Sequence, residues 1–203
     1  MTSDAVQLAL DSIAPWVGMS GRAKALEERQ AWAAILLPHD ALSWAMRYLE
    51  SKGSAFATST CALVGCRYCR RLGCTCREHS RPYQPRTGQA VADIQRIAQR
   101  HGAWLTSASD LAALPKPGDV LCMRIGNPHI SVVTEVRESD RTITCIDGGQ
   151  KDNTLTARRE RQHRADGTVV DLADGYANPV GRVSRLYARA SGQRIAETPE
   201  LCS

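Results

Sequence analysis

Residues 117–150 decide the fold, and they read PGDVLCMRIGNPHISVVTEVRESDRTITCIDGGQ. Three short runs in this stretch, 119–123, 130–136 and 142–146, are rich in β-branched residues and are separated by turn-forming residues. Such runs are typical of strands whose side chains alternate between the two faces of a sheet. The stretch therefore predicts three neighbouring strands of a small antiparallel sheet.

The residues before this stretch have the spacing of helices. Apolar side chains recur every three or four residues, and capping residues, glycine or proline stand where each segment starts or ends. A helical front followed by an antiparallel sheet is an α+β layout. The expected helices cover 6–16, 23–36, 40–53, 59–73, 91–102 and 107–114.

The length of the chain favours one domain. Its 203 residues with 43% hydrophobic content are enough to bury one substantial core. Within that domain we expect a helical flank at 1–53, a core at 54–150 and a C-terminal extension at 151–203. The extension is polar and basic apart from two short runs, 168–170 and 183–187, which are expected to add edge strands.

Charge and hydropathy exclude several classes of protein. The formal net charge of +5 is mild and does not indicate a nucleic-acid partner. No apolar run approaches the roughly 20 residues that a membrane span needs. The first residues lack the basic and then apolar layout of a secretory signal. We therefore expect no membrane span and no general secretory signal, and nothing in the sequence indicates a cofactor.

Cys61 is the candidate nucleophile. It follows Ser59 and Thr60, whose hydroxyls can cap the first turn of the expected helix at 59–73. The partial positive charge at a helix start lowers the pKa of a thiol, and the free backbone amides there can stabilise an anionic intermediate. A buried small side chain in the first turn is the alternative interpretation of a single cysteine.

His129 and Asp147 are the candidate partners of this thiol. If the strands around 130–136 and 142–146 form a hairpin centred at Glu138, residue 129 lies opposite residue 147. Their side chains then share one face, about 5 Å apart at Cβ. Each residue taken alone is a common turn former. Together with a cysteine at a helix start, the two predict a nucleophile, a base and an acid that orients the base.

Five of the eight cysteines fall within 16 residues, from Cys61 to Cys76. Three explanations of this cluster stay open: a zinc site, one or two disulfides, or small buried thiols that pack a helix. The zinc ligands would come from Cys66, Cys69, Cys74, Cys76 and His79, but the paired C-x2-C knuckles of strong zinc signatures are absent.

With these motifs the sequence resembles the papain-like NlpC/P60 and CHAP superfamily of bacterial cell-wall peptidases and amidases. Ser59-Thr60-Cys61 matches the turn of the nucleophile, and residues 117–121, Pro-Gly-Asp-Val-Leu, match the motif that opens a strand. Residues 129–133, His-Ile-Ser-Val-Val, match the histidine strand, and Ile146-Asp147 matches the strand of the third catalytic residue. The resemblance spans residues 59 to about 150.

The resemblance implies a papain-like α+β fold and a function. Cys61 would attack an amide bond in a peptidoglycan stem peptide, His129 would act as base and then as acid, and Asp147 would orient the histidine. The run at 146–150, with Arg158 and Arg161 after it, is also similar to TseH-like effectors of type VI secretion. A contractile apparatus would then deliver the protein to the periplasm of a rival cell, with a cognate immunity protein as a further partner.

Three features depart from the family pattern. No glutamine stands shortly before Cys61 to complete a papain-type oxyanion hole, so Gln150 or a group of the loop at 77–90, such as Tyr83, would take that role or bind substrate. Asp147 stands where NlpC/P60 members more often have histidine. The cysteine cluster is not part of the general family pattern, and no wall-binding module is recognisable.

Two other functions remain open from the sequence. One is a zinc-stabilised basic binding module, in which the cysteine cluster holds the metal and neighbouring arginines meet a polyanion. The other is a thiol deamidase that uses the same three residues on a protein side chain. The bond that is cut depends on the shape of a cleft that we expect from 77–90 and 148–165.

Overall fold

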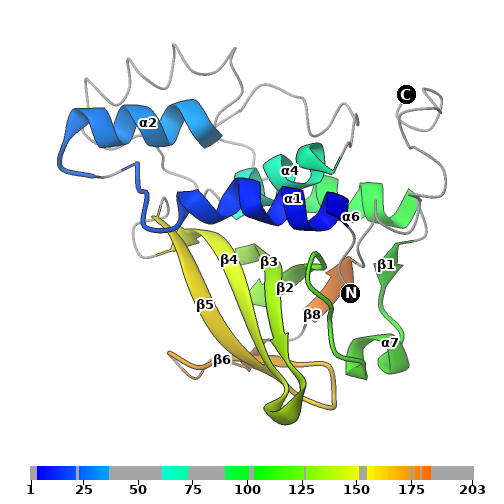
Figure 1. Ribbon diagram of the computed structural model, residues 1–203. Coiled ribbons are helices and arrows are strands. Elements are labelled where there is room, and N and C mark those ends of the chain that lie inside the picture. Colours follow the sequence, from blue (N-terminus) through cyan, green and yellow to red (C-terminus); the bar gives the residue numbers. More distant parts are fainter. Residues whose placement is uncertain are drawn as a thin grey trace.

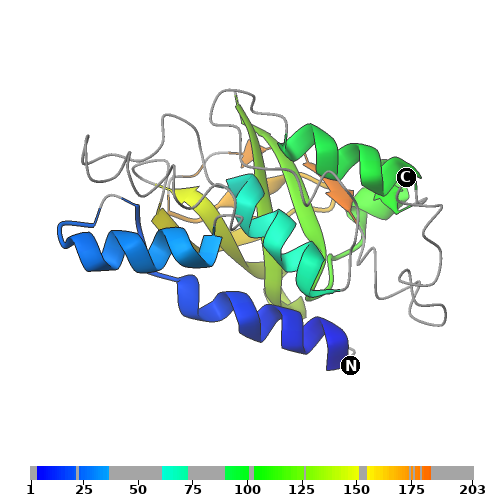
Figure 2. The same cartoon turned by 90° about the horizontal axis from the view of Figure 1, so that it is seen from above.

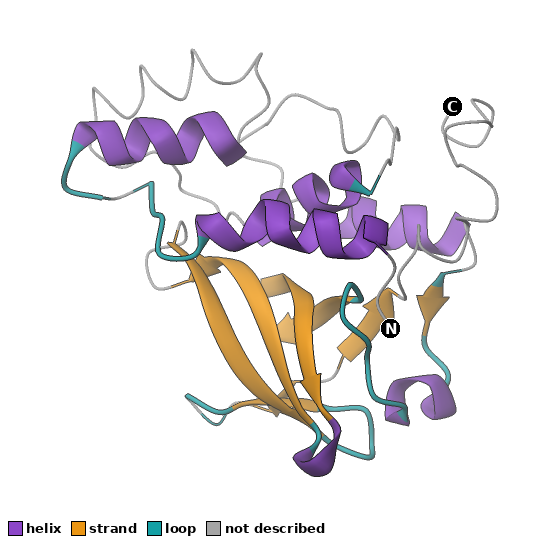
Figure 3. Cartoon of the chain, viewed as in Figure 1, coloured by secondary structure: helices purple, strands orange, loops and turns teal. Residues whose placement is uncertain are grey.

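In a computed structural model the chain has the expected α+β class, with helices beside one curled antiparallel sheet (Figure 3). The structure describes residues 4–21, 23–36, 61–72, 90–100, 103–125, 127–150, 155–173, 175, 177–178 and 180–183. The helix expected at 40–53 lies outside these residues. The papain-like assignment within the α+β class stays a prediction.

Within the described residues, eight strands form the sheet in the order β1-β8-β2-β3-β4-β5-β6-β7, and every neighbouring pair is antiparallel (Figure 1). The three strands predicted from 117–150 are its centre. The strands are β1 (Trp104–Leu105), β2 (Val120–Ile125), β3 (Asn127–Arg137), β4 (Thr142–Gln150), β5 (Leu155–His163), β6 (Val169–Asp171), β7 (Ala177–Asn178) and β8 (Val180–Val183).

The longer helices form a layer over one side of this sheet (Figures 1 and 2). They are α1 (Asp4–Ile13), continued by a 3-10 turn at Ala14–Trp16, α2 (Leu26–Leu36), α4 (Cys61–Arg71) and α6 (Ala90–Arg100). The short α7 (Ala108–Ala112) has the predicted cap, because the Ser107 hydroxyl accepts a hydrogen bond from the Asp110 amide. In the described part of the chain, no helix has the length and apolarity to cross a bilayer.

Two contacts fix α4 against the sheet. A Cβ added at Gly65 would lie 2.9 Å from Ile130 Cγ2, so glycine lets the helix backbone approach β3 closely. The buried Tyr68 hydroxyl donates a 3.0 Å hydrogen bond to the carbonyl of Gly118, in the turn before β2. The predicted Pro-Gly-Asp motif therefore serves as a turn that holds the helix of Cys61.

The predicted register of the central hairpin is wrong by two residues. Asp147 lies opposite Ser131, not opposite His129. A β-bulge between Val133 and Glu135 shifts the pairing, and a 3.1 Å hydrogen bond from the Thr134 hydroxyl to the Thr144 carbonyl spans it. His129 and Asp147 are consequently diagonal neighbours on one face, within reach of each other.

The bulge decides which face Asp147 occupies. Near the turn, Arg137 pairs with Thr142, and that register continued without a bulge would set Asp147 opposite Val132. Val132 and His129 are an odd number of residues apart, so Asp147 would then lie on the opposite face from His129. The extra residue at the bulge restores the shared face.

Each of the two runs expected to form an edge strand after residue 150 overlaps a strand, but the strand of this region at the edge of the described sheet is β7. β6 lies between β5 and β7, and β8 lies between β1 and β2, so neither is an edge of the described sheet. No strand was predicted at the position of β5. Several of its buried positions carry polar side chains, Thr156, Arg161 and His163, so the apolar alternation of an ordinary strand is missing.

Candidate active site

Cys61 is the first residue of α4 and is only 3% exposed. It is a free thiol, and it shares a side-chain hydrogen bond with His129. The described structure therefore brings the predicted nucleophile and the predicted base together, across 68 residues of sequence. The helix start also directs free backbone amides toward the region of the thiol.

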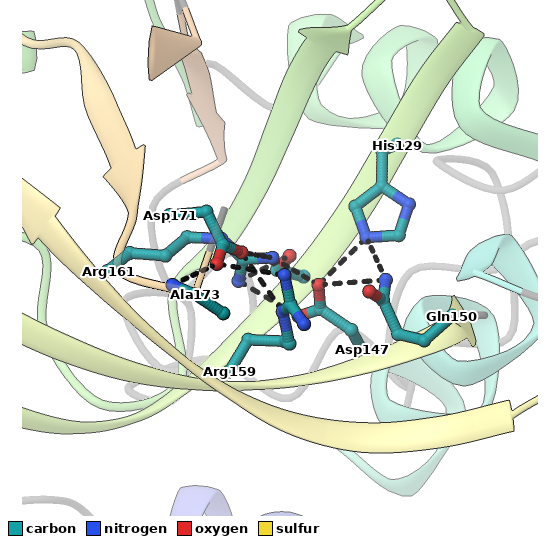
Figure 4. Close-up of polar contacts among 8 residues, drawn as sticks. His129, Asp147, Gln150, Arg159, Arg161, Asp171 and Ala173 are labelled. Carbon is teal, nitrogen blue, oxygen red and sulfur yellow. Dashed lines mark hydrogen bonds and ion pairs between the residues drawn. The ribbon is translucent and has the colours of Figure 1, made fainter. Parts of the chain in front are cut away.

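His129 lies near the start of β3 and keeps 14% of its side-chain surface exposed. Its Nε2 lies 2.9 Å from Oδ2 of the fully buried Asp147 (Figure 4). Asp147 is the third predicted residue, so the three candidate catalytic side chains form one continuous set.

The partners of Asp147 determine the tautomer of His129. Oδ2 of Asp147 contacts His129 Nε2, Gln150 Nε2 and Arg161. An ionised carboxylate only accepts hydrogen bonds, so His129 must donate from Nε2. In the neutral ring Nδ1 is then the basic nitrogen.

The pKa values in the site follow from burial and charge. Burial alone would lower the pKa of His129, but hydrogen bonds with Asp147 and Cys61, and the negative charges of both, raise it to about 9. Burial alone would raise the pKa of Asp147, but the Arg161 charge and the contact with His129 hold it well below its usual value. The site therefore favours an imidazolium beside an ionised carboxylate at neutral pH.

Gln150 also belongs to this cluster. Its Nε2 lies 3.3 Å from Asp147 Oδ2 and 3.3 Å from His129 Nε2. A second bulge, between Asp147 and Gln150, makes this contact possible, because without it residues three apart would face opposite sides of the sheet. Gly149 adopts a φ of 72° within this bulge, a conformation that suits glycine. The described contacts of Gln150 are with the His–Asp pair, and its predicted oxyanion role stays a prediction.

Behind Asp147 lies a group of charged side chains whose contacts were not predicted, although Arg161 is one of the residues that carry the resemblance (Figure 4). Arg161 on β5 donates to both oxygens of Asp147 and also contacts Asp171 at 3.3 Å. Asp171 in turn accepts two hydrogen bonds from Arg159, at 3.0 and 2.8 Å. The spacing of Arg159 and Arg161, two residues apart, places both side chains on one face if the segment is a strand. Because no strand was predicted there, the two arginines could not be assigned to the site.

The other cysteines differ from Cys61 in their surroundings. Cys69, Cys122 and Cys145 are free and buried. Burial raises the pKa of Cys122 and of Cys145 to about 12, although the nearby Arg161 charge partly opposes the effect of burial at Cys145. These two thiols therefore stay protonated at neutral pH.

Several predicted residues cannot be placed. Tyr83, Cys74, Cys76 and His79 lie outside the described residues, and the side chain of Cys66 is likewise outside them. Among the described residues, no group of three or more histidine, cysteine or acidic side chains could hold a metal ion. The zinc and disulfide explanations of the cysteine cluster thus stay untested.

Comparisons with known proteins identify no relative: no family model, no curated protein and no solved structure matches the chain. The class of the protein must therefore be argued from the site. A free thiol at a helix start, a histidine in contact with it and a carboxylate that accepts from that histidine are the groups that a thiol-dependent acyl transfer requires.

Proposed function

We propose that the chain is a cysteine hydrolase that cleaves an amide bond in peptidoglycan stem peptides. The observation that carries this proposal is the continuous contact from Cys61 through His129 to Asp147. A histidine held by a carboxylate in this way takes the proton of a thiol and then passes it to the leaving group.

In the first half of the reaction, the Cys61 thiolate attacks the carbonyl carbon of the amide. His129 holds the thiol proton, and Nδ1 is the nitrogen for this transfer because Nε2 already binds Asp147. The tetrahedral intermediate collapses to a thioester, and His129 gives its proton to the leaving amine. The backbone amide of Cys61 stabilises the oxyanion, with a second donor from Gln150 or the loop of Tyr83.

In the second half, a water molecule attacks the thioester. His129 takes a proton from this water, and the bond between sulfur and carbon breaks to release a carboxylic acid. The sulfur leaves as the Cys61 thiolate and His129 keeps the proton from the water, so the starting thiolate and imidazolium are restored. Asp147 accepts the Nε2 proton of His129 throughout, which stabilises each imidazolium that forms.

The choice of substrate rests on the resemblance to NlpC/P60 and CHAP enzymes. The same resemblance suggests a papain-like arrangement of the α+β fold and, more specifically, a TseH-like effector delivered by type VI secretion, with an immunity protein as its inhibitor. A thiol deamidase of protein side chains would use the same three residues, so only the substrate separates the two activities.

Digestion of purified peptidoglycan tests the proposal. Sacculi are incubated with the native protein, with Cys61→Ala and with Cys69→Ala, and released fragments are identified by mass spectrometry. Cys69 is a matched control, because it is a buried free cysteine of the same helix. Fragments from the native and Cys69→Ala proteins alone are expected, and their masses name the bond. No fragments from a folded native protein would reject the wall substrate.

A further inference from the structure

Four alternating charges extend from the candidate site into the sheet. The order of contacts is Asp147, Arg161, Asp171 and Arg159. The first three side chains are 6% exposed or less, and Arg159 is 24% exposed. Burial of ions costs free energy unless ion pairs and hydrogen bonds compensate the lost contact with water. A row of four charged side chains next to a candidate active site therefore needs an explanation.

Arg161 holds Asp147 by both oxygens. One terminal nitrogen donates to Oδ1 at 3.1 Å, and the other donates to Oδ2, the same oxygen that faces His129. Such a two-pronged contact fixes the plane of the carboxylate as well as its position. Arg161 is held in turn by Asp171 at 3.3 Å and by the Ser131 hydroxyl at 3.3 Å.

We propose that Arg161 is a positioning residue of the site: it keeps Asp147 ionised and keeps Oδ2 directed at His129, while Asp171 holds Arg161 from behind. This inference rests on the proposed role of Asp147. Arg161 touches neither His129 nor Cys61 in the described contacts, so it acts through the carboxylate.

The balance of charge predicts how the site responds when a member is removed. The two arginines and two aspartates have no net charge, and a thiolate beside an imidazolium adds none. Without the Arg161 charge, one buried negative charge is in excess, so the site binds a proton more readily at Asp147 or at Cys61. A proton at either place leaves less thiolate at a given pH. Without the Asp171 charge, the excess is positive, and the thiolate is favoured.

The experiment measures the rate of Cys61 alkylation by iodoacetamide from pH 4 to 10, with the site of labelling determined by mass spectrometry. The midpoint of the rise in rate reports formation of the thiolate. For Arg161→Gln we expect the midpoint to move up by about one pH unit or more. For Asp171→Asn we expect it to move down by about half a unit, since that charge is farther away. Shifts of opposite sign are not expected from general loosening of the fold.

Arg158→Gln is the matched control. Arg158 neighbours Arg159 on β5, but its half-exposed side chain pairs with Glu135 at the surface. In Arg158→Gln the midpoint of Cys61 alkylation should stay within about 0.3 pH unit of the native value, because an exposed ion pair contributes little to the electrostatics of a buried site. Circular dichroism checks that each variant is folded. If Arg161→Gln does not fold, Asp171→Asn decides alone: a lower midpoint supports the proposal, and an unchanged or higher midpoint overturns it.

An unmoved midpoint in folded Arg161→Gln overturns the proposal, as does a shift of the same sign in both variants. The readout needs no substrate, so it is independent of the proposed function. Opposite shifts in a protein that releases nothing from sacculi would keep Arg161 in this role and reject the wall substrate. Fragments released by a protein with unmoved midpoints would support the hydrolase and remove Arg161 from its site.

Discussion

At the scale of single residues, Cys61 differs from the other described cysteines in its neighbour, not in its burial. Cys61, Cys69, Cys122 and Cys145 are all at most 7% exposed. Cys61 shares a hydrogen bond with His129, whereas burial raises the pKa of Cys122 and Cys145 to about 12. A histidine beside a thiol stabilises the thiolate, which is the reactive form.

The first prediction is that Cys61 is alkylated selectively. At pH 7, iodoacetamide should label Cys61 at least about tenfold faster than Cys122 or Cys145, because reaction requires a thiolate. Peptide mapping by mass spectrometry after short exposures gives the rates. In His129→Ala, labelling of Cys61 should slow toward the rate of the other thiols. Equal labelling in the native protein would contradict the assignment of Cys61.

A second prediction separates the two roles of His129. Its pKa is raised to about 9, so it holds a proton for the leaving amine below that pH and loses it above. Hydrolysis should therefore fall as the pH rises through about 9. Alkylation of Cys61 should not fall there, since the thiolate persists without the imidazolium. Both rates are measured on one preparation from pH 6 to 10.5, and a parallel fall in both would argue against His129 as the acid.

At the scale of elements, two bulges build the site. The one between Val133 and Glu135 sets Asp147 on the face of His129, and the one between Asp147 and Gln150 returns Gln150 to that face. Strict alternation along β3 and β4 would leave Asp147 on the opposite face from His129 and Gln150. The site thus depends on interruptions of the ladder as much as on the ladder itself.

The elements that could be predicted from the sequence are those whose signal lies in a few neighbouring residues. The three central strands, the helix of Cys61 and the cap at Ser107 each have a signal within a few residues, and the structure confirms them. A bulge depends on the partner strand, so the hairpin register was missed. β5 was missed because charged side chains that pair across the sheet occupy buried positions where apolar ones were expected.

The third prediction concerns the bulge before Gln150. Gly149→Ala places a side chain at a φ of 72°, and we expect it to lower the free energy of unfolding by about 1–2 kcal/mol. Gly175→Ala is a matched control: Gly175 has the same φ, and an added Cβ would meet nothing within 4 Å. Urea denaturation should show similar losses for both variants. Hydrolysis should fall only in Gly149→Ala, and equal activity in the two would remove the bulge from the site.

At the scale of the whole molecule, the site lies where the helical layer meets the sheet. Cys61 comes from α4, while His129 and Asp147 come from β3 and β4. The geometry of the site therefore depends on the packing between the helical layer and the sheet. Two contacts maintain this packing: the close approach of α4 to β3 at Gly65 and the hydrogen bond from Tyr68 to Gly118. Global stability and the state of the site are linked, since the buried ionisable groups contribute to both.

The last prediction uses this link. The folded-state pKa of His129 is raised above its unfolded value of 6.5, so its contribution to stability is fully present below about pH 6.5 and is lost as the pH rises through the folded value. Ionisation of Cys61 would complicate the measurement, so it is made in Cys61→Ala. In this variant Asp147 still raises the pKa of His129. The rise is smaller than in the native site, because Cys61 no longer contributes to it.

The free energy of unfolding is compared between Cys61→Ala and the double variant Cys61→Ala/His129→Gln by urea denaturation at several pH values. The difference should be constant below about pH 6 and should shrink by about 1–2 kcal/mol between pH 6.5 and 9. The same comparison with Arg158→Gln as the second change should show no such trend, because Arg158 pairs with Glu135 at the surface and contacts none of the candidate catalytic residues in the described contacts. A difference of equal size at pH 6 and pH 9.5 would mean that the pKa of His129 does not rise on folding. Asp147 would then not stabilise the imidazolium of His129, and the proposed mechanism depends on that stabilisation.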